Sequence, residues 1–429
     1  MKRSLPLVAI FTLFSAAAFG VDRPTAQKLA REILRADGFW DIAATTGFFD
    51  HHGPPRQLPF DALQQCGVRG AMLGIGTLTE VIIARSLTDY SREEVPAETN
   101  LFRHVFHGAA LIQRQLWEFD AAYQAAQKDP RLKIITTAAD LEQAFRGQQV
   151  AVLLGLDTGA CINEDLAALR MYQRLGLRKL ALVHAPGTSW ADSLYGKGPG
   201  DKLGLSKFGQ EVVKECNRLG VLVDVSHCSD KTFWDTIAVA TKPLIATHSG
   251  ARAISKINRN LTDEMLRALA SKGGMIGVCG LFDEEESRLA QESMRSPNMI
   301  AVSVFLAEKY HDQYQLAAAV TDPRQQLEAR KQLRLDRSRE YSFMPMPEKN
   351  ALHARILVDH LDHIIKIVGI DHVGIGTDTN MTQAGYPDLI EEIVTALVQR
   401  NYTREQIQKI LRGNFVRFFK SVTAGTPSQ

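Results

Sequence analysis

Short apolar runs recur along the chain from Val68 onward, and each is followed by a stretch with helical spacing. The seven runs are VRGAMLGI, VAVLLGL, KLALVHA, GVLVDVSH, PLIATHS, GMIGVCG and HVGIGTD. Apolar runs of this length are typical of strands that are buried on both faces of a sheet. The segment that leads into Asp37-Gly38-Phe39 would add an eighth strand. Strands that alternate with helices predict a parallel sheet with right-handed crossovers.

The stretches between the runs carry ordinary helix signals. LAALRMYQRLG and GQEVVKECNRLG both show helical spacing, and they end at Gly176 and Gly220. Eight strand and helix pairs predict a (β/α)8 barrel, with an open doubly wound sheet as the alternative. A doubly wound sheet would carry a Gly-rich phosphate loop after its first strand, and the sequence shows none there. The pattern therefore favours the barrel.

One segment interrupts this rhythm. Residues 281–350 are rich in charge, Gln and Arg, and they include DPRQQLEARKQLRLDRSREY. We expect them to form a helical insertion between the seventh and eighth strands of a single barrel domain that spans residues 21–429. A solvated surface is the simple explanation of this charge, and a lid or a subunit contact, such as that of a homodimer, is the alternative.

Composition narrows the class of protein. Of the 429 residues, 45% are hydrophobic and 23% are charged, as in ordinary soluble globular proteins. Lys and Arg number 50 against 48 acidic residues, so the formal charge of +2 gives no support for nucleic-acid binding. The five cysteines form no C-x-x-C pair, and the sequence cannot pair them into disulfides.

The N-terminus reads as a leader. Residues 1–20, MKRSLPLVAIFTLFSAAAFG, join two basic residues to an apolar run and then to small residues. This order is typical of a secretory signal peptide, so we expect a secreted or periplasmic protein. The alternative is an uncleaved membrane anchor. Because the apolar run is shorter than the ~20 residues that a helical span needs, no stable membrane span is expected.

Polar residues stand where successive strands should end. These residues are Asp157, His184, His227, His248 and Asp378. In a barrel the carboxyl ends of the strands meet at one face, where the chemistry of such folds takes place. Imidazole suits zinc, and a carboxylate such as Asp157 could complete a ligand set with His227 and His248. A single histidine of this kind is more often a core or capping residue, but its recurrence at neighbouring strand ends favours a site.

The chain resembles the membrane dipeptidase (renal dipeptidase) family of zinc peptidases. The likeness extends from about Asp37 to the last predicted helix and rests on six ordered blocks. These are VAVLLGLDTG, LGLRKLALVHAPGTSWADS, GLSKFGQEVVKECNRLGVLVDVSHCSDKTFWD, PLIATHSGARAI, INRNLTDEMLRALASKGG and LDHIIKIVGIDHVGIGTD. The resemblance implies a metal-dependent (β/α)8 hydrolase with two zinc ions at the mouth of the barrel.

The resemblance also implies a role for each site residue. His227 and His248 would bind one zinc, Asp157 would bridge both, and Asp41 would bind the other. His184 would hold the substrate and polarise the scissile carbonyl. Arg259 would bind the carboxylate of a dipeptide, and Asp378 would transfer protons beside the metals. Such donors and proton carriers are what the hydrolysis of an amide by a metal-activated water requires. Arg259 pairing with a surface acid, or Asp378 capping the following helix, are the alternatives.

The chain departs from the family pattern at three places. The family's first motif, D-G-H-x-D, is DGFWD here, so Phe39 stands where a ligating histidine is expected. Asp157 replaces a glutamate, which shortens the bridging carboxylate by one methylene. The family's D-x-D-G after the last strand is DTNM here. We therefore expect one zinc ion and a weak or empty second site, for which His51 and His52 are substitutes only if their loop folds inward.

Three hypotheses follow from these departures. The first is a secreted zinc dipeptidase, or a one-metal variant of it, that cleaves dipeptides or related small amides. The second is a catalytically silent barrel that binds a peptide or small molecule through His184 and Arg259. The third is an enzyme of the same scaffold that tailors a peptide-derived metabolite.

Overall fold

The computed structural model describes residues 21–45, 60–75, 109–146, 149–184, 187–194, 204–279, 345–381 and 385–425, with single positions between 313 and 333. The expected leader, residues 1–20, lies outside this described part, as do His51, His52 and most of the expected insertion at 281–350. Among the described helices, none has both the length and the apolar character that a bilayer crossing requires.

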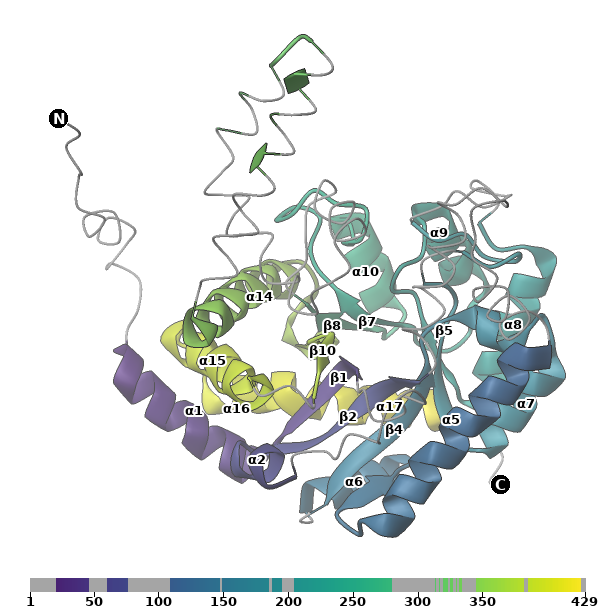
Figure 1. Cartoon of the computed structure of the whole chain (residues 1–429), viewed down its shortest axis with the longest axis horizontal. Coiled ribbons are helices and arrows are strands. Elements are labelled where there is room, and N and C mark those ends of the chain that lie inside the picture. The colour runs from purple at the N-terminus through teal and green to yellow at the C-terminus, as the bar shows by residue number, and fades with distance from the viewer. Residues whose placement is uncertain are drawn as a thin grey trace.

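Parallel strands form a barrel at the centre of the molecule (Figure 1). In order around it they are β1 (Phe39–Thr45), β2 (Val68–Ile75), β4 (Val150–Leu156), β5 (Leu177–Ala181), β6 (Leu222–Asp224), β7 (Ile245–Ser249), β8 (Met275–Val278) and β9 (Val373–Ile375). The short β10 (Thr379–Asn380) follows β9 in the chain and pairs with β1, so the barrel is nearly closed. The extra strand β3 (Leu132–Ile134) pairs with β4. The predicted (β/α)8 barrel is confirmed, and the open sheet is wrong.

Helices surround the strands (Figure 1). They are α1 (Arg23–Asp37), α2 (Phe60–Gln65), α5 (Ala109–Lys128), α6 (Ala138–Arg146), α7 (Leu166–Arg174), α8 (Lys207–Leu219), α9 (Asp230–Val239), α10 (Asp263–Ser271), α14 (Met346–Val368), α15 (Tyr386–Gln399), α16 (Arg404–Gln408) and α17 (Asn414–Thr423). Side chains cap several of them: Ser206, for example, accepts a hydrogen bond from the Gly209 amide at the start of α8. Gly220 ends α8 in the left-handed conformation, with φ of 67°.

The first strand differs from the prediction. The sequence pattern predicts a strand that leads into Asp37 and ends near Phe39, whereas the structure places helix α1 there and begins β1 at Phe39. The physical reason is local. The Asp22 side chain caps α1, Pro24 lies in its first turn, and Gly38 ends it with φ of 75°. The apolar residues of α1 also recur at helical spacing and are buried.

Two apolar layers hold the barrel together. The outer layer lies between the sheet and the helices and includes Phe39. The inner layer fills the barrel: Trp40 and Ile42 lie there, and Trp40 stacks on Phe415 of α17 with ring centroids 5.5 Å apart. All five cysteines are described and none forms a disulfide; Cys228 is buried like an apolar side chain.

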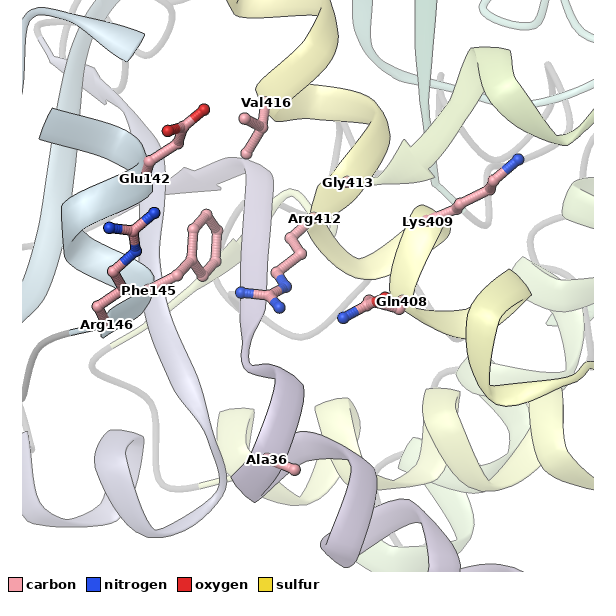
Figure 2. Close-up of a pocket in the computed structure, with 9 residues that line it drawn as sticks. All are labelled: Ala36, Glu142, Phe145, Arg146, Gln408, Lys409, Arg412, Gly413 and Val416. Carbon is pink, nitrogen blue, oxygen red and sulfur yellow. The ribbon is translucent and has the colours of Figure 1, made fainter. Parts of the chain in front are cut away.

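A cavity of about 480 Å³ opens at the amino ends of the strands (Figure 2). Its walls come from the ends of α1, α6 and α16, from α17 and from the segment between α16 and α17. The Arg412 guanidinium lies 5.0 Å from the Phe145 ring centroid. The residues selected from the sequence for chemistry follow the carboxyl ends of the strands instead. The candidate site is therefore at the other end of the barrel.

Candidate active site

Three histidines and an arginine meet at the carboxyl ends of β5, β6 and β7. The ring centroids of His184 and His227 are 4.1 Å apart, and those of His227 and His248 are 4.9 Å apart. Arg259 is only 4% exposed, and its Nη2 lies 3.2 Å from His227 Nε2. The structure therefore brings together four of the residues that the sequence analysis selected.

A chain of hydrogen bonds fixes the orientation of His248. The Thr247 hydroxyl donates to Oδ2 of the fully buried Asp224 at 2.6 Å, and it lies 2.7 Å from His248 Nδ1. Because the hydroxyl proton points to the carboxylate, its oxygen accepts from Nδ1–H. The proton of a neutral His248 is then on Nδ1, and the lone pair is on Nε2. Carboxylates and hydroxyls behind a histidine orient metal ligands in this way.

The Nε2 atom of His227 presents a lone pair toward His248, as the Nε2 atom of His248 does toward His227. A guanidinium can only donate, so the contact from Arg259 makes His227 Nε2 an acceptor. The two Nε2 atoms are 2.9 Å apart. His227 also adopts a positive φ of 65°, a conformation that non-glycine residues seldom adopt and that concentrates at functional sites. Two acceptors that face each other at this distance are the arrangement that a cation between them stabilises.

The surroundings keep both imidazoles neutral. Burial lowers the pKa of His227 and of His248 well below the ordinary value, and the positive charges of Arg259 and Lys179 lower it further. A neutral imidazole is the form that binds a metal. The pair is therefore ready to bind a divalent cation without first losing a proton.

A buried lysine that the sequence analysis missed lies beside this pair. Lys179 on β5 is 3% exposed, and its ammonium forms an ion pair with Asp157 and lies 3.7 Å from Asp224 Oδ2. Burial acts to lower the pKa of Lys179, but the two carboxylates outweigh it and raise the pKa above the ordinary value. The available signal was a lysine inside an apolar strand run, RKLALV.

Asp41 lies in a polar cage. Its Oδ1 accepts hydrogen bonds from the Ala43 and Thr377 amides, at 3.1 and 3.0 Å. Its Oδ2 accepts from the hydroxyls of Thr377 and Tyr386, at 2.6 and 2.7 Å. Burial nevertheless raises its pKa to about 6. A carboxylate has about four acceptor positions, so these donors fill its capacity. A metal at Asp41 would have to displace some of them.

Phe39 and Asp378 are near neighbours in the chain of residues that form this cage. Phe39 precedes Asp41 by two positions on β1, and Asp378 directly follows Thr377. Phe39 is 1% exposed and packs in the outer apolar layer, so its side chain is part of the core. The Asp378 amide donates to the Ala43 carbonyl at 2.8 Å, and its φ is 53°. Burial raises the pKa of Asp378 to about 7, with help from the charges of Asp157 and Asp41 and against that of Arg259.

The donor set fits one metal ion better than two. His227 and His248 supply converging lone pairs, which suits zinc. For a second ion, Phe39 has no lone pair, Asp41 is saturated by protein donors and Asp157 is paired with Lys179. No group of three or more His, Cys, Asp or Glu side chains with a metal-binding arrangement occurs in the part of the chain that the structure describes.

Sequence comparison links the chain to one group of enzymes. The family model described as membrane dipeptidase (Peptidase family M19) matches residues 25–427. Mouse Dipeptidase 3 is 27% identical over 327 residues, which cover 72% of this chain and 52% of the relative. An uncharacterized dipeptidase from Schizosaccharomyces pombe is 29% identical over 302 residues, which cover 67% and 57%. The chain spans about half the length of the curated relatives it matches.

Solved structures show the same fold. The probable dipeptidase PvdM from Pseudomonas aeruginosa superposes with a TM-score of 0.68 at 22% identity, covering 93% of this chain and 98% of that one. A metallo peptidase from Rhodobacter sphaeroides, liganded with a phosphinate mimic of the dipeptide L-Ala-D-Ala, has a TM-score of 0.58 at 22% identity, with 90% and 99% covered. At these identities the likeness supports the barrel architecture.

Proposed function

The chain belongs to the membrane dipeptidase family (Peptidase family M19), and from this premise we propose that it is a zinc-dependent hydrolase of dipeptides or related small amides. The observation that carries the proposal is the pair of neutral imidazoles, His227 and His248, whose Nε2 atoms converge at the carboxyl ends of the strands. Metallopeptidases of this family depend on zinc in general, and converging imidazole lone pairs are zinc ligands.

His227 and His248 are the residues that would hold the metal. A bound zinc ion supplies Lewis-acid polarisation of the scissile carbonyl and lowers the pKa of the attacking water. His184 lies against His227. In this proposal it would donate a hydrogen bond to the carbonyl oxygen as negative charge develops on it. Arg259 is a fixed cation beside the same rings, and a free C-terminal carboxylate of a short peptide is the group it attracts.

Asp378 is the proposed carrier of the proton. Its pKa of about 7 means that near neutral pH it both accepts a proton and gives one up. It would take the proton from the attacking water and pass it to the departing amine. The hydrogen bond from its amide to the Ala43 carbonyl holds the Asp378 backbone, whose φ is positive, beside β1.

A direct experiment compares dipeptide hydrolysis by the wild type and by His248→Ala. His372→Ala is the matched control, because His372 bonds the Gly274 carbonyl at the opposite end of β9. We expect the first variant to lose hydrolysis and the control to keep it. Hydrolysis that persists in His248→Ala would contradict the proposal.

A second candidate function is peptide binding without hydrolysis. It is favoured by one observation: the residues on which a second metal would depend are engaged within the protein, Asp41 by four donors and Asp157 by Lys179. Tight dipeptide binding with no turnover at any zinc concentration would select this function. We also propose that residues 1–20 are a signal peptide that directs export and is then removed. Mass spectrometry of the exported protein, which should lack these residues, would test this.

A further inference from the structure

Lys179 lies in a space that neighbouring strands leave open for it. In the sheet Gly74, Gly155 and Lys179 form a row across β2, β4 and β5. A Cβ atom on Gly155 would overlap the Lys179 stem, and one on Gly74 would overlap the Asp157 carboxylate. Two glycines therefore make room for the lysine stem and for the carboxylate it binds.

Burying an ammonium group at this place costs free energy unless nearby negative charges compensate it. Removing Lys179 and the two carboxylates from water carries a desolvation penalty that packed apolar residues would avoid. The penalty is offset here by two negative charges, Asp157 and Asp224. Asp224 also bonds the Thr247 hydroxyl, which orients His248. The lysine thus connects the expected bridging carboxylate to the hydrogen bonds behind a zinc ligand.

We infer that the Lys179 ammonium is a built-in cation that takes a metal ion's place as the partner of Asp157, so that the site holds a single metal ion at His227 and His248. This inference rests on the proposed zinc-dependent function and names the charge arrangement of that same site. Phe39 in the core and Asp41 in its cage agree with it, because neither offers a free ligand for a second ion.

The proposed role of Lys179 differs from that of an ordinary structural ion pair because it lowers the affinity of the site for a metal ion. While Lys179 holds Asp157, that carboxylate is not available as a third ligand, and the ammonium repels a divalent cation nearby. A neutral residue of similar length at position 179 should therefore release Asp157 toward the histidines and increase zinc affinity.

The test is a double-mutant cycle read by zinc stoichiometry and zinc affinity, measured by metal analysis and by competition with a chromophoric chelator. The proteins are the wild type, Lys179→Met, Asp157→Asn and the double variant. Lys179→Arg is the conservative control that keeps the charge. The double variant removes both charges of the pair, so it still reports if Lys179→Met alone fails to fold.

We expect one zinc ion per wild-type chain, and at least about 10-fold tighter binding in Lys179→Met, because a positive charge is lost and a ligand is gained. Asp157→Asn, which leaves the ammonium without this partner, should weaken zinc binding, whereas the double variant, which removes both charges, should bind zinc within about 3-fold of the wild type. Lys179→Arg should resemble the wild type.

Two zinc ions per wild-type chain, or unchanged affinity in Lys179→Met, would overturn the inference and leave the proposed function standing. If Asp157→Asn and the double variant both bound zinc much more weakly than the wild type, and by the same factor, Asp157 would be a zinc ligand in the wild type. That result would also overturn the inference. Zinc in none of the proteins would contradict the proposed function itself, and the inference with it.

Discussion

The hydroxyl of Thr247 is the point at which the orientation of His248 can be disturbed without touching a metal ligand. Thr247→Val keeps the shape of the side chain and removes the oxygen that lies 2.6 Å from Asp224 Oδ2 and 2.7 Å from His248 Nδ1. Without it, nothing in this chain of bonds holds the proton of His248 on Nδ1. The imidazole is then free to turn its Nε2 lone pair away from His227.

The expected loss can be worked from these two bonds. Changing the partner behind a metal-binding histidine typically weakens metal affinity by about 10- to 100-fold, or about 1.4 to 2.8 kcal/mol at about 1.4 kcal/mol per tenfold. The free energy of unfolding should also fall by about 2–4 kcal/mol, because two buried polar atoms lose a partner.

Competition for zinc with a chromophoric chelator measures the first effect, and urea denaturation measures the second. Thr236→Val is the control, since the buried Thr236 hydroxyl donates to the Thr232 carbonyl of its own helix, at 2.6 Å. It should lose about 1 kcal/mol of stability and no zinc affinity. Thr247→Ser should restore binding. Unchanged zinc affinity in folded Thr247→Val would refute the reasoning.

Three further predictions concern other parts of the molecule. Burial lowers the pKa of His360 from 6.5 to about 4, so its stabilising effect is present above pH 6.5 and is lost as the pH falls toward 4. Between pH 7 and 5, the free energy of unfolding measured in urea should fall by about 2 kcal/mol less in His360→Asn than in the wild type. An equal fall in both proteins would count against this. Arg259→Ala should raise KM about 10-fold or more for dipeptides with a free carboxylate but hardly for C-terminally amidated ones, and steady-state kinetics showing equal effects on both would remove its assigned role. Phe39→His should lower the free energy of unfolding by about 2–5 kcal/mol without adding a zinc ion, so a second ion by metal analysis would contradict its place in the apolar layer.

The barrel and its histidine cluster were predictable because both depend on local pattern. Apolar runs such as those of β2 and β4 have the bounds that the sequence indicates. In a parallel barrel all strands end at the same face, so histidines that follow successive runs must come together. His184, His227 and His248 do lie near one another in the structure.

The parts that the sequence left open depend on contacts between distant residues. Asp41 is caged by Thr377 and Tyr386, which are 336 and 345 positions away in the chain. No local pattern reveals such partners. Lys179 was missed because a lysine in an apolar run has no assigned face until strand register is known. The start of β1 was misplaced because a Gly after Asp37 ends a helix as readily as a strand.

Dipeptide turnover during zinc titration of the metal-free protein tests the central claim most directly. Bound zinc is counted per chain at each step, alongside the rate of amino acid release. Turnover should be absent without metal, rise with the first equivalent and level off at one ion per chain, held by His227 and His248. Turnover by the metal-free protein, or none at any zinc concentration, would contradict zinc-dependent hydrolysis, and a rate that keeps rising to two ions would contradict the single-metal site.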